Sequence, residues 1–451
     1  MQMEVLGDAA RRAVAYLQVM PTRRVAPGES AVRDLEQLGG VLPEEPSDPC
    51  AVVELLDRAG SPATVATAGG RFFGFVIGAA VPASVGAAWL AAAWDQNTAL
   101  RAMSPVGAAV EEVALGWVRD LLGLPAECGG ALVTGATMAN FCGILAARHA
   151  LLERAGWDVE SDGLFGAPTI QVVAGAEVHI SLVKAVGMAG LGRKRFVRVP
   201  VDGQGRMRLS GLPALDQRTI VCIQAGNVNT GAFDPAGEIC RRARDAGAWV
   251  HVDGAFGLWA AASAKYRHLT AGFEKADSWA TDAHKWPNVG YDCGIALVRD
   301  AAALRAAMAI AAAYITPGEL REPSQYTPEM SRRARGVELW AALRSMGRRG
   351  LAELIERTCG HAQKFAAGLR EAGYEILNDV AINQVLVSFG SPEVTCAVIE
   401  RVQREGTCWC GASEWQGRTA MRISVSSWAT TEEDVEVSLE AIRRIARECR
   451  A

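Results

Sequence analysis

Short apolar runs alternate with longer helical patterns between residues 130 and 300. The apolar runs lie at 131–133, 169–173, 220–223, 249–252 and 294–298. Several of the stretches between them have the apolar spacing of a helix. A continuous apolar strand is buried on both faces, so this alternation predicts a mostly parallel central sheet with helices on both faces. The predicted fold class is α/β.

Helical and irregular segments flank the predicted sheet. The first part of the chain indicates a helix followed by proline-rich loops, and residues 83–121 are alanine-rich with helical period. A long helix is expected from Ser331, then strands near 384–389 and 421–425 and a final helix. We therefore expect three parts: an N-terminal helical and loop segment (1–85), a large α/β domain (86–335) and a small C-terminal α+β domain (336–451).

Composition narrows the classes of function. The chain has 451 residues, and Lys plus Arg (46) nearly balance Asp plus Glu (50), so no basic excess indicates a nucleic-acid partner. Cys408 and Cys410 are two residues apart, but neither a second pair nor a histidine at ligand spacing follows, so no metal site is expected. The first residues, Met1 to Arg12, lack the pattern of a secretory signal, which favours reduced thiols and a cytoplasmic location.

Residues 72–94 carry no charged side chain and are long enough to span a bilayer. Pro82 interrupts this stretch, its many alanines and glycines give little drive for insertion, and polar Asp95 follows directly. We expect a buried segment at a subunit interface and no membrane span.

Candidate chemistry begins with Lys285 in the sequence Asp282-Ala283-His284-Lys285-Trp286. Such a lysine on its own is more often a surface residue than a catalytic one. Asp253 changes this, because it ends the predicted strand 249–252, and the carboxyl ends of parallel strands form the usual ligand-binding edge. An aspartate there suits the ring nitrogen of pyridoxal 5′-phosphate (PLP), which it keeps protonated so that the ring can accept electrons. Taken alone, Asp253 could equally cap the next turn.

A turn of small residues, Thr134-Gly135-Ala136-Thr137, joins a predicted strand to a predicted helix. Such a turn lets backbone N–H groups approach a phosphate at a helix N-terminus. It lacks the Gly-Lys-Ser/Thr of a nucleotide-binding loop. A turn of this kind, then a strand-end aspartate, then a lysine about thirty residues later is the order found in fold type I PLP enzymes.

With these residues in place, the sequence resembles the group II PLP-dependent amino acid decarboxylases, which act on aromatic amino acids, histidine or glutamate. The resemblance covers nearly the whole chain. It rests on motifs in a fixed order: Ser104-Pro105 with Glu111, His251-Val252-Asp253-Gly254-Ala255, Ala283-His284-Lys285-Trp286 with Asp292-Cys293, and Ser331-Arg332-Arg333 with Leu339-Trp340 and Leu343-Arg344.

The resemblance implies a role for each matching residue. Lys285 would carry the cofactor as a Schiff base, and Asp253 would pair with the pyridinium nitrogen. His179 would stack on one face of the cofactor ring, and Ala255 would pack against the other. The remaining expected contacts are to the phosphate, from Gly135, Ala136, Thr137 and His284.

Three positions depart from the family's pattern, and one of them is Phe256, which stands where many relatives have a tyrosine. Asp282 replaces a common asparagine, and no phosphate role is assigned to it because two anions repel. Gly226-Asn227-Val228-Asn229 replaces a Gly-Thr-Thr segment, where Asn227, or alternatively Asn229, is expected to contact the cofactor's phenolic oxygen. Tyr326, in the segment 316–330, is predicted to be the tyrosine that protonates the substrate carbanion.

The resemblance implies an enzyme that converts an L-amino acid to its amine and CO₂. Two alternatives stay open: a PLP enzyme of the same fold with another reaction (lyase, aldehyde synthase or aminotransferase), and a catalytically silent structural homologue. A homodimer is expected, with no nucleic acid or membrane partner.

Overall fold

The computed structural model describes residues 2–310 and 320–450. Its chain divides into two compact units. The large unit comprises residues 80–360 and 378–384, and the small unit comprises 1–79, 361–377 and 385–451. The candidate chemistry lies in the large unit.

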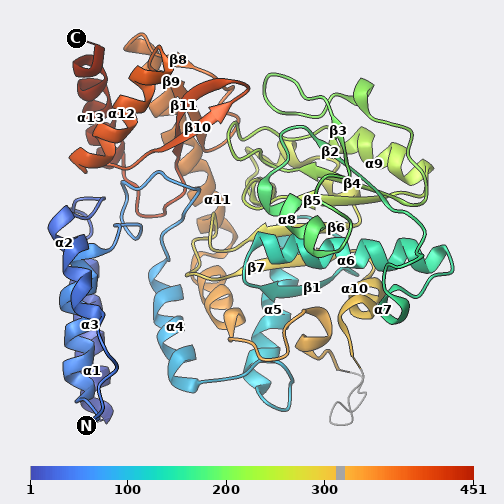
Figure 1. Ribbon diagram of the computed structural model, residues 1–451, viewed down its shortest axis with the longest axis horizontal. Coiled ribbons are helices and arrows are strands. Elements are labelled where there is room, and N and C mark those ends of the chain that lie inside the picture. The colour runs from blue at the N-terminus through green and yellow to red at the C-terminus, as the bar shows by residue number, and fades with distance from the viewer. Residues whose placement is uncertain (1, 311–319, 451) are drawn as a thin grey trace. The chain divides into compact units, whose positions relative to one another are not determined.

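A seven-stranded sheet forms the centre of the large unit, in the order β1-β7-β6-β5-β4-β2-β3 (Figure 1). Strands β2 to β6 pair in parallel, whereas β7 runs antiparallel to its neighbours β1 and β6. This confirms the predicted α/β class with a mostly parallel sheet. The strands are β1 (Gly129–Val133), β2 (Gln171–Gly175), β3 (Phe196–Val199), β4 (Thr219–Gln224), β5 (Trp249–Asp253), β6 (Ser278–Asp282) and β7 (Gly294–Val298).

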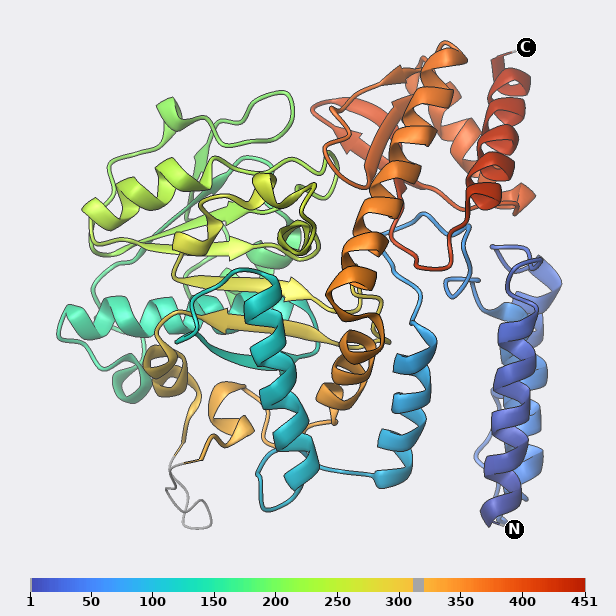
Figure 2. The same ribbon diagram turned by 180° about the vertical axis from the view of Figure 1, so that it is seen from behind.

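Helices cover both faces of this sheet. α6 lies in front of the sheet in Figure 1, and α5 lies in front of it in Figure 2, where the molecule is seen from behind. Alternate residues of the strands, such as Cys222 and Ala296, pack with α6, α8 and α10 in one buried cluster. The helices are α4 (Pro82–Trp94), α5 (Pro105–Leu121), α6 (Ala136–Arg154), α7 (Val159–Asp162), α8 (Ile180–Met188), α9 (Ala236–Asp245) and α10 (Ala301–Met308).

The apolar stretch 72–94 is not one long helix. Its helical part, α4, has 13 residues, fewer than the ~20 that a bilayer requires. Among the helices within residues 2–310 and 320–450, none combines the length and hydropathy of a membrane span. Ala87 and Ala91 of α4 pack against Ala334 and Val337, which leaves the opposite side of the helix exposed.

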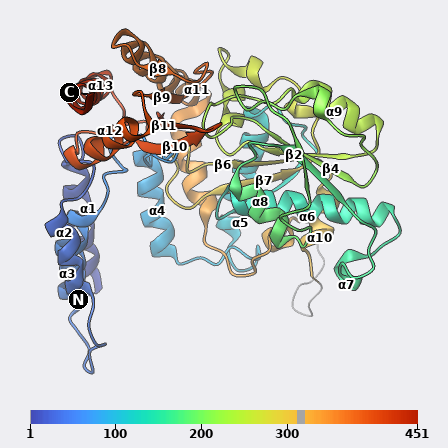
Figure 3. The same ribbon diagram turned by 45° about the horizontal axis from the view of Figure 1, so that its top comes forward.

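The small unit combines the two ends of the chain. Its N-terminal helices α1 and α3 lie side by side (Figures 1 and 3), joined by an ion pair between Arg12 and Asp57. Phe72 stacks on Trp409, which ties the N-terminal segment to the C-terminal strands. Its elements are α1 (Gln2–Gln18), α2 (Glu29–Asp34), α3 (Pro49–Ala63), α12 (Pro392–Glu405), α13 (Glu432–Arg450) and the sheet β10-β11-β9-β8, with β8 (Glu375–Ile376), β9 (Gln384–Ser388), β10 (Gly411–Trp415) and β11 (Arg418–Ser424).

These units differ from the three parts expected from the sequence. Helix α11 (Arg335–Glu371) begins at the expected boundary, but residues up to 360 belong to the large unit. Val337 of α11 packs against α4, which belongs to the large unit. Apolar contacts of this kind explain why the first half of α11 belongs to the same unit. The N-terminal residues 1–79 share a unit with the C-terminal sheet instead of forming a separate segment.

Candidate active site

A narrow cleft lies at the carboxyl ends of the parallel strands. Parallel pairing brings these strand ends to one edge of the sheet, and the register places Gln224 of β4 beside Asp253 of β5. The cleft is lined by His179, Gln224, Gly226, Val228, Asp253, Ala255, Phe256 and Lys285. Four residues predicted from the sequence to share a site, His179, Asp253, Ala255 and Lys285, are therefore brought together.

Asp253 is held by an asparagine from the neighbouring helix. It is 5% exposed, and its Oδ2 accepts a hydrogen bond from Nδ2 of Asn140 at 3.2 Å. On the other side of the amide, Oδ1 of Asn140 lies 2.8 Å from Nε2 of His251. The carboxylate can accept only from the NH₂ end of the amide, so Asn140 Oδ1 must accept from His251. The charge of Asp253 thus has a fixed donor inside the fold.

His251 is neutral in this network. It is fully buried, and the loss of solvation lowers its pKa to about 3. With the proton on Nε2, its Nδ1 accepts from the hydroxyl of Ser278 at 2.8 Å. His251 therefore positions Asn140 without adding a charge behind Asp253.

The same asparagine connects to His179. Nδ2 of Asn140 also lies 3.4 Å from Oγ of Ser181, and this hydroxyl lies 2.7 Å from Nδ1 of His179. His179 caps α8, because its Nδ1 accepts the backbone N–H of Ser181 at 3.2 Å. A chain of side chains therefore orients the imidazole and the carboxylate on two sides of one cleft.

The predicted phosphate turn begins α6. Gly135 precedes the helix, Ala136 is its first residue, and Thr137 lies half-buried in its first turn. A side chain at Gly294 of β7 would collide with the backbone of Gly135, at 2.4 Å, so β7 approaches this turn closely. The N–H of Ala136 already donates to Oδ1 of Asp282 at 2.6 Å. The turn joins a strand to a helix as the sequence predicts, and a carboxylate lies beside it.

His284 lies beside the same turn. Its ring is near Gly135, its Nδ1 accepts the backbone N–H of Cys293 at 3.1 Å, and its Nε2 faces Asp282 at 3.6 Å. Burial lowers the pKa of His284. Tyr291 packs on the imidazole with ring centres 4.4 Å apart, a contact that the sequence did not indicate. The pKa of Tyr291 is raised to about 12, mainly by burial, so its hydroxyl is neutral at physiological pH.

Asn227 has a different task from the predicted one. Its Oδ1 accepts the backbone N–H groups of Asn229 and Thr230, at 2.9 and 3.2 Å, and so closes a turn. Val228 lines the cleft in its place. The polar side chain from β4 that reaches the cleft is Gln224, whose Nε2 donates to the carbonyl of Glu177 at 3.1 Å. Asn227 does not line the cleft, although its Nδ2 donates to the same carbonyl of Glu177 at 3.5 Å.

Tyr326 also lies away from the cleft. Its ring packs on the buried cluster beside α10, next to Gly129 at the start of β1, and the guanidinium of Arg321 covers it at 4.8 Å. Gly129 is six residues from Gly135 along an extended strand, roughly 20 Å away. The ring therefore does not line the cleft of its own chain. Within the segment 316–330, Pro323–Tyr326 form a short 3₁₀ helix, and residues up to 319 lie outside the described residues.

The residues of the site that sequence reasoning missed include Asn140, Ser181 and Gln224. Asn140 could have been noticed, because it is an uncharged polar residue in a helix whose inward positions are otherwise small or apolar. Ser181 and Gln224 carry no such signal, since their relevance comes only from the approach of separate strands and helices.

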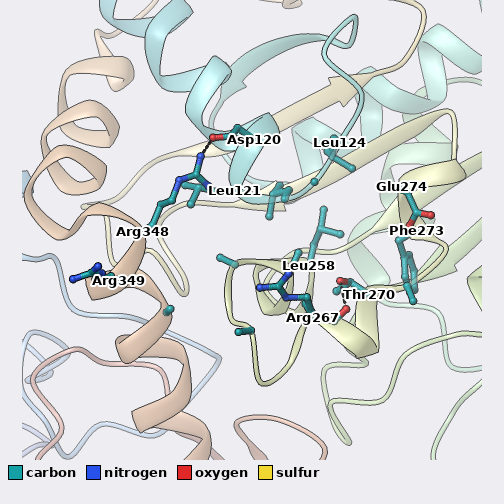
Figure 4. A pocket seen from close by; sticks show the side chains of 17 residues that line it. Asp120, Leu121, Leu124, Leu258, Arg267, Thr270, Phe273, Glu274, Arg348 and Arg349 are labelled. Carbon is teal, nitrogen blue, oxygen red and sulfur yellow. Dashed lines mark hydrogen bonds and ion pairs between the residues drawn. The ribbon is translucent and has the colours of Figure 1, made fainter.

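A larger cavity lies elsewhere in the large unit. It has a volume of about 630 Å³ and is lined by apolar residues such as Leu258 and by the guanidinium groups of Arg267, Arg348 and Arg349 (Figure 4). Arg348 forms an ion pair with Asp120 across it. None of the residues that line the Lys285 cleft borders this cavity. The chemistry of the side chains, not the size of the cavity, therefore identifies the candidate site.

The family relationship follows from a match over most of the chain. Residues 61–390 match the family model of the pyridoxal-dependent decarboxylase conserved domain. The chain belongs to this family. Membership also fixes the cofactor as PLP. The family confirms the resemblance seen in the sequence motifs.

Relatives of this chain are named as decarboxylases of different amino acids. Tryptophan decarboxylase 1 of Oryza sativa subsp. japonica is 27% identical over 76% of this chain and 74% of its own length. The acidic amino acid decarboxylase of Mus musculus is 26% identical over 77% and 68%. A solved structure of Oryza sativa TDC with PLP and tryptamine superposes with a TM-score of 0.90 at 23% identity, covering 99% of this chain and 97% of that one.

The side chains of the cleft fit PLP. A buried carboxylate, Asp253, suits the pyridinium nitrogen, and the amine of Lys285 suits the aldehyde group. The N-terminus of α6 suits the phosphate. His179 and the small side chain of Ala255 both line the cleft and suit the two faces of the ring. Among the described residues, no group of His, Cys, Asp and Glu side chains forms a metal site.

Proposed function

We propose that this protein decarboxylates an L-amino acid to its amine and CO₂, with the cofactor bound covalently to Lys285. In this reaction the bond from Cα to the carboxyl carbon breaks, CO₂ leaves, and a proton takes its place on Cα. When bound, PLP supplies the electron sink for the bonding pair. The observation that carries the proposal is that Lys285 and the Asn140-supported Asp253 line one cleft.

The protein's own residues would supply orientation and electrostatics. Asp253, held by Asn140, would keep a positive charge at one end of the cleft. His179, fixed by Ser181, would form one wall and Ala255 the other. Holding a reacting group in one orientation in this way is a large part of what an enzyme contributes beyond its cofactor.

A screen for CO₂ release tests the proposal. The purified, PLP-loaded protein is incubated with single L-amino acids, both aromatic and acidic, and CO₂ and amine are measured. We expect release with at least one of them, and none from Lys285→Ala. Lys265→Ala is a matched control, because Lys265 is a surface residue outside the cleft. Absence of release from the wild-type protein with all amino acids would contradict the proposal and favour a silent homologue.

Product analysis separates amine formation from the main alternative. One relative, 26% identical over 74% of this chain, is the phenylacetaldehyde synthase of a Rosa hybrid cultivar. Aldehyde formation consumes O₂, whereas decarboxylation to an amine does not. We expect the amount of amine to equal the amount of CO₂, without oxygen uptake. If oxygen is taken up and an aldehyde is the product, the protein is an aldehyde synthase and the proposal of amine formation is wrong.

We also propose a homodimer. Helix α4 exposes Trp89, Leu90 and Trp94 in its C-terminal half, with exposed fractions of 43%, 53% and 43%. Large apolar side chains grouped on one exposed helix are typical of a protein interface. A second copy of the chain would bury them, as closed symmetric dimers do.

A further inference from the structure

The carboxylate of Asp282 lies between the phosphate turn and Lys285. Asp282 ends β6 and is 2% exposed. Its Oδ1 accepts the N–H of Ala136 at 2.6 Å, and its Oδ2 lies 2.9 Å from Nζ of Lys285. One buried side chain therefore contacts both the first N–H of α6 and the amine of the candidate site.

These two contacts are the ones that PLP needs. The N–H groups at the start of a helix bind phosphate because they have no partner within the helix and the helix dipole favours an anion. Asp282 already uses the N–H of Ala136 as an anion would. It also holds the amine of Lys285, which must become available for covalent attachment of the cofactor.

The charged groups around the turn 134–137 do not compensate for a phosphate in addition to the carboxylate of Asp282. His284 faces Asp282, but burial lowers its pKa and so disfavours the imidazolium form. Lys285 provides a cation, and it pairs with Asp282 itself. Two anions about 4 Å apart repel by an amount that is large inside a protein. A phosphate at this turn and the carboxylate of Asp282 in its present position therefore oppose each other.

We propose that Asp282 is an internal competitor of the cofactor phosphate, which weakens the binding of PLP and must give up Ala136 and Lys285 when PLP binds. The inference rests on the proposed binding of PLP in this cleft. It assigns to Asp282 a positioning role, since the residue acts through the turn and the lysine. It further implies that a protein with a neutral side chain at position 282 binds the phosphorylated cofactor more tightly than the wild-type protein.

Titration with two forms of the cofactor tests the inference. Cofactor-depleted wild-type protein and Asp282→Asn are titrated with PLP and with pyridoxal, which lacks the phosphate, and the quenching of tryptophan fluorescence gives each Kd. We expect Asp282→Asn to bind PLP about tenfold more tightly or better, because a repelling charge is gone. The Kd for pyridoxal should fall much less, because pyridoxal meets only the pairing of Asp282 with Lys285 and not the repulsion between two anions.

Asp277→Asn is the matched control. Asp277 lies just before β6 and accepts the backbone N–H of Val250 at 2.7 Å, away from the turn. Its variant should bind both ligands as the wild-type protein does. Circular dichroism and thermal unfolding show whether each variant is folded. If Asp282→Asn does not fold, Asp282→Ser gives the same neutral position with a smaller side chain.

Each outcome has one meaning. The inference is overturned if Asp282→Asn binds PLP no more tightly than the wild-type protein. It is also overturned if PLP and pyridoxal gain equally, because Asp282 would then act on the lysine alone. If no folded variant binds PLP at all, the proposed function fails, which is a different result from equal, measurable Kd values.

Discussion

The side-chain amide of Asn140 donates to the carboxylate of Asp253 at 3.2 Å. This bond joins a helix that covers the sheet to the strand end that forms the cleft. It gives a buried carboxylate a fixed partner, which such a charge requires. Asn140 is fully buried and also binds His251, so its orientation is set on both sides.

Removing this amide should weaken cofactor binding. Asn140→Ala leaves Asp253 without its donor, and losing one partner of a buried charged group costs about 1–3 kcal/mol. We expect the Kd for PLP to rise on the order of tenfold, measured by fluorescence titration. Asn378→Ala is the control: Asn378 is also buried and donates to the carbonyl of Thr230, so this variant should lose stability but keep its affinity for PLP. Equal effects in both variants would contradict a role specific to Asn140.

Acid should destabilise the fold through His251. Burial lowers its pKa to about 3, whereas histidine in an unfolded chain titrates near about 6.5. As pH falls from 6.5 towards 3, the unfolded chain takes up a proton that the native state refuses. The free energy of unfolding therefore falls by about 1.4 kcal/mol per pH unit from this residue, and its contribution is complete above pH ~6.5.

His251→Gln should remove this pH dependence. Urea unfolding at several pH values between about 7.5 and 4.5 measures it, and the variant should lose less stability on acidification than the wild-type protein. Burial raises the pKa of Asp234 to about 6, which gives a slope of opposite sign, but it is present in both proteins and cancels in the comparison. Parallel stability curves would show that His251 is not the source.

The elements that the sequence predicted well are those with a continuous apolar pattern. The run 294–298 is strand β7, and 220–223 lies within β4. Strand β6 was harder to predict from the sequence, because Ser278, Thr281 and Asp282 are polar yet buried in the middle of the sheet. The expected helical stretch 83–121 is two helices, since Asp95 adopts a left-handed conformation and ends α4.

Some residues of the candidate site could likewise be predicted from the sequence, and others could not. Asp253 could be predicted because it ends an apolar strand, and Lys285 because its motif follows that aspartate at the spacing found in fold type I PLP enzymes. The task of Asn227 could not, because an asparagine that closes its own turn has the same sequence as one that faces a ligand. The contact of Asp282 with Ala136 joins residues 146 positions apart, and no local pattern contains it.

A charge on the exposed side of α4 should prevent dimer formation. Leu90→Asp places a carboxylate where the proposed interface excludes water, so light scattering at low micromolar concentration should show a monomer. Phe165→Asp is the control, since Phe165 is 96% exposed outside this helix. A wild-type monomer, or an unchanged mass for Leu90→Asp, would rule out an interface on this side of α4.

Tyr326→Phe should leave the products unchanged. The hydroxyl lies on a ring packed between Arg321 and the start of β1, so its loss removes no donor from the cleft. Mass spectrometry of the products should give the same ratio of amine to aldehyde as the wild-type protein. A shift towards aldehyde would return Tyr326 to the reaction and require the segment after Leu320 to move.

The covalent attachment point of PLP tests the central claim most directly. Borohydride reduction of the PLP-loaded protein, digestion and peptide mass spectrometry identify the modified lysine. We predict one major modified peptide, which contains Lys285, and no major modification in Lys285→Ala. Modification mainly at another lysine, such as Lys265 or Lys364, would contradict the assignment of this cleft as the active site.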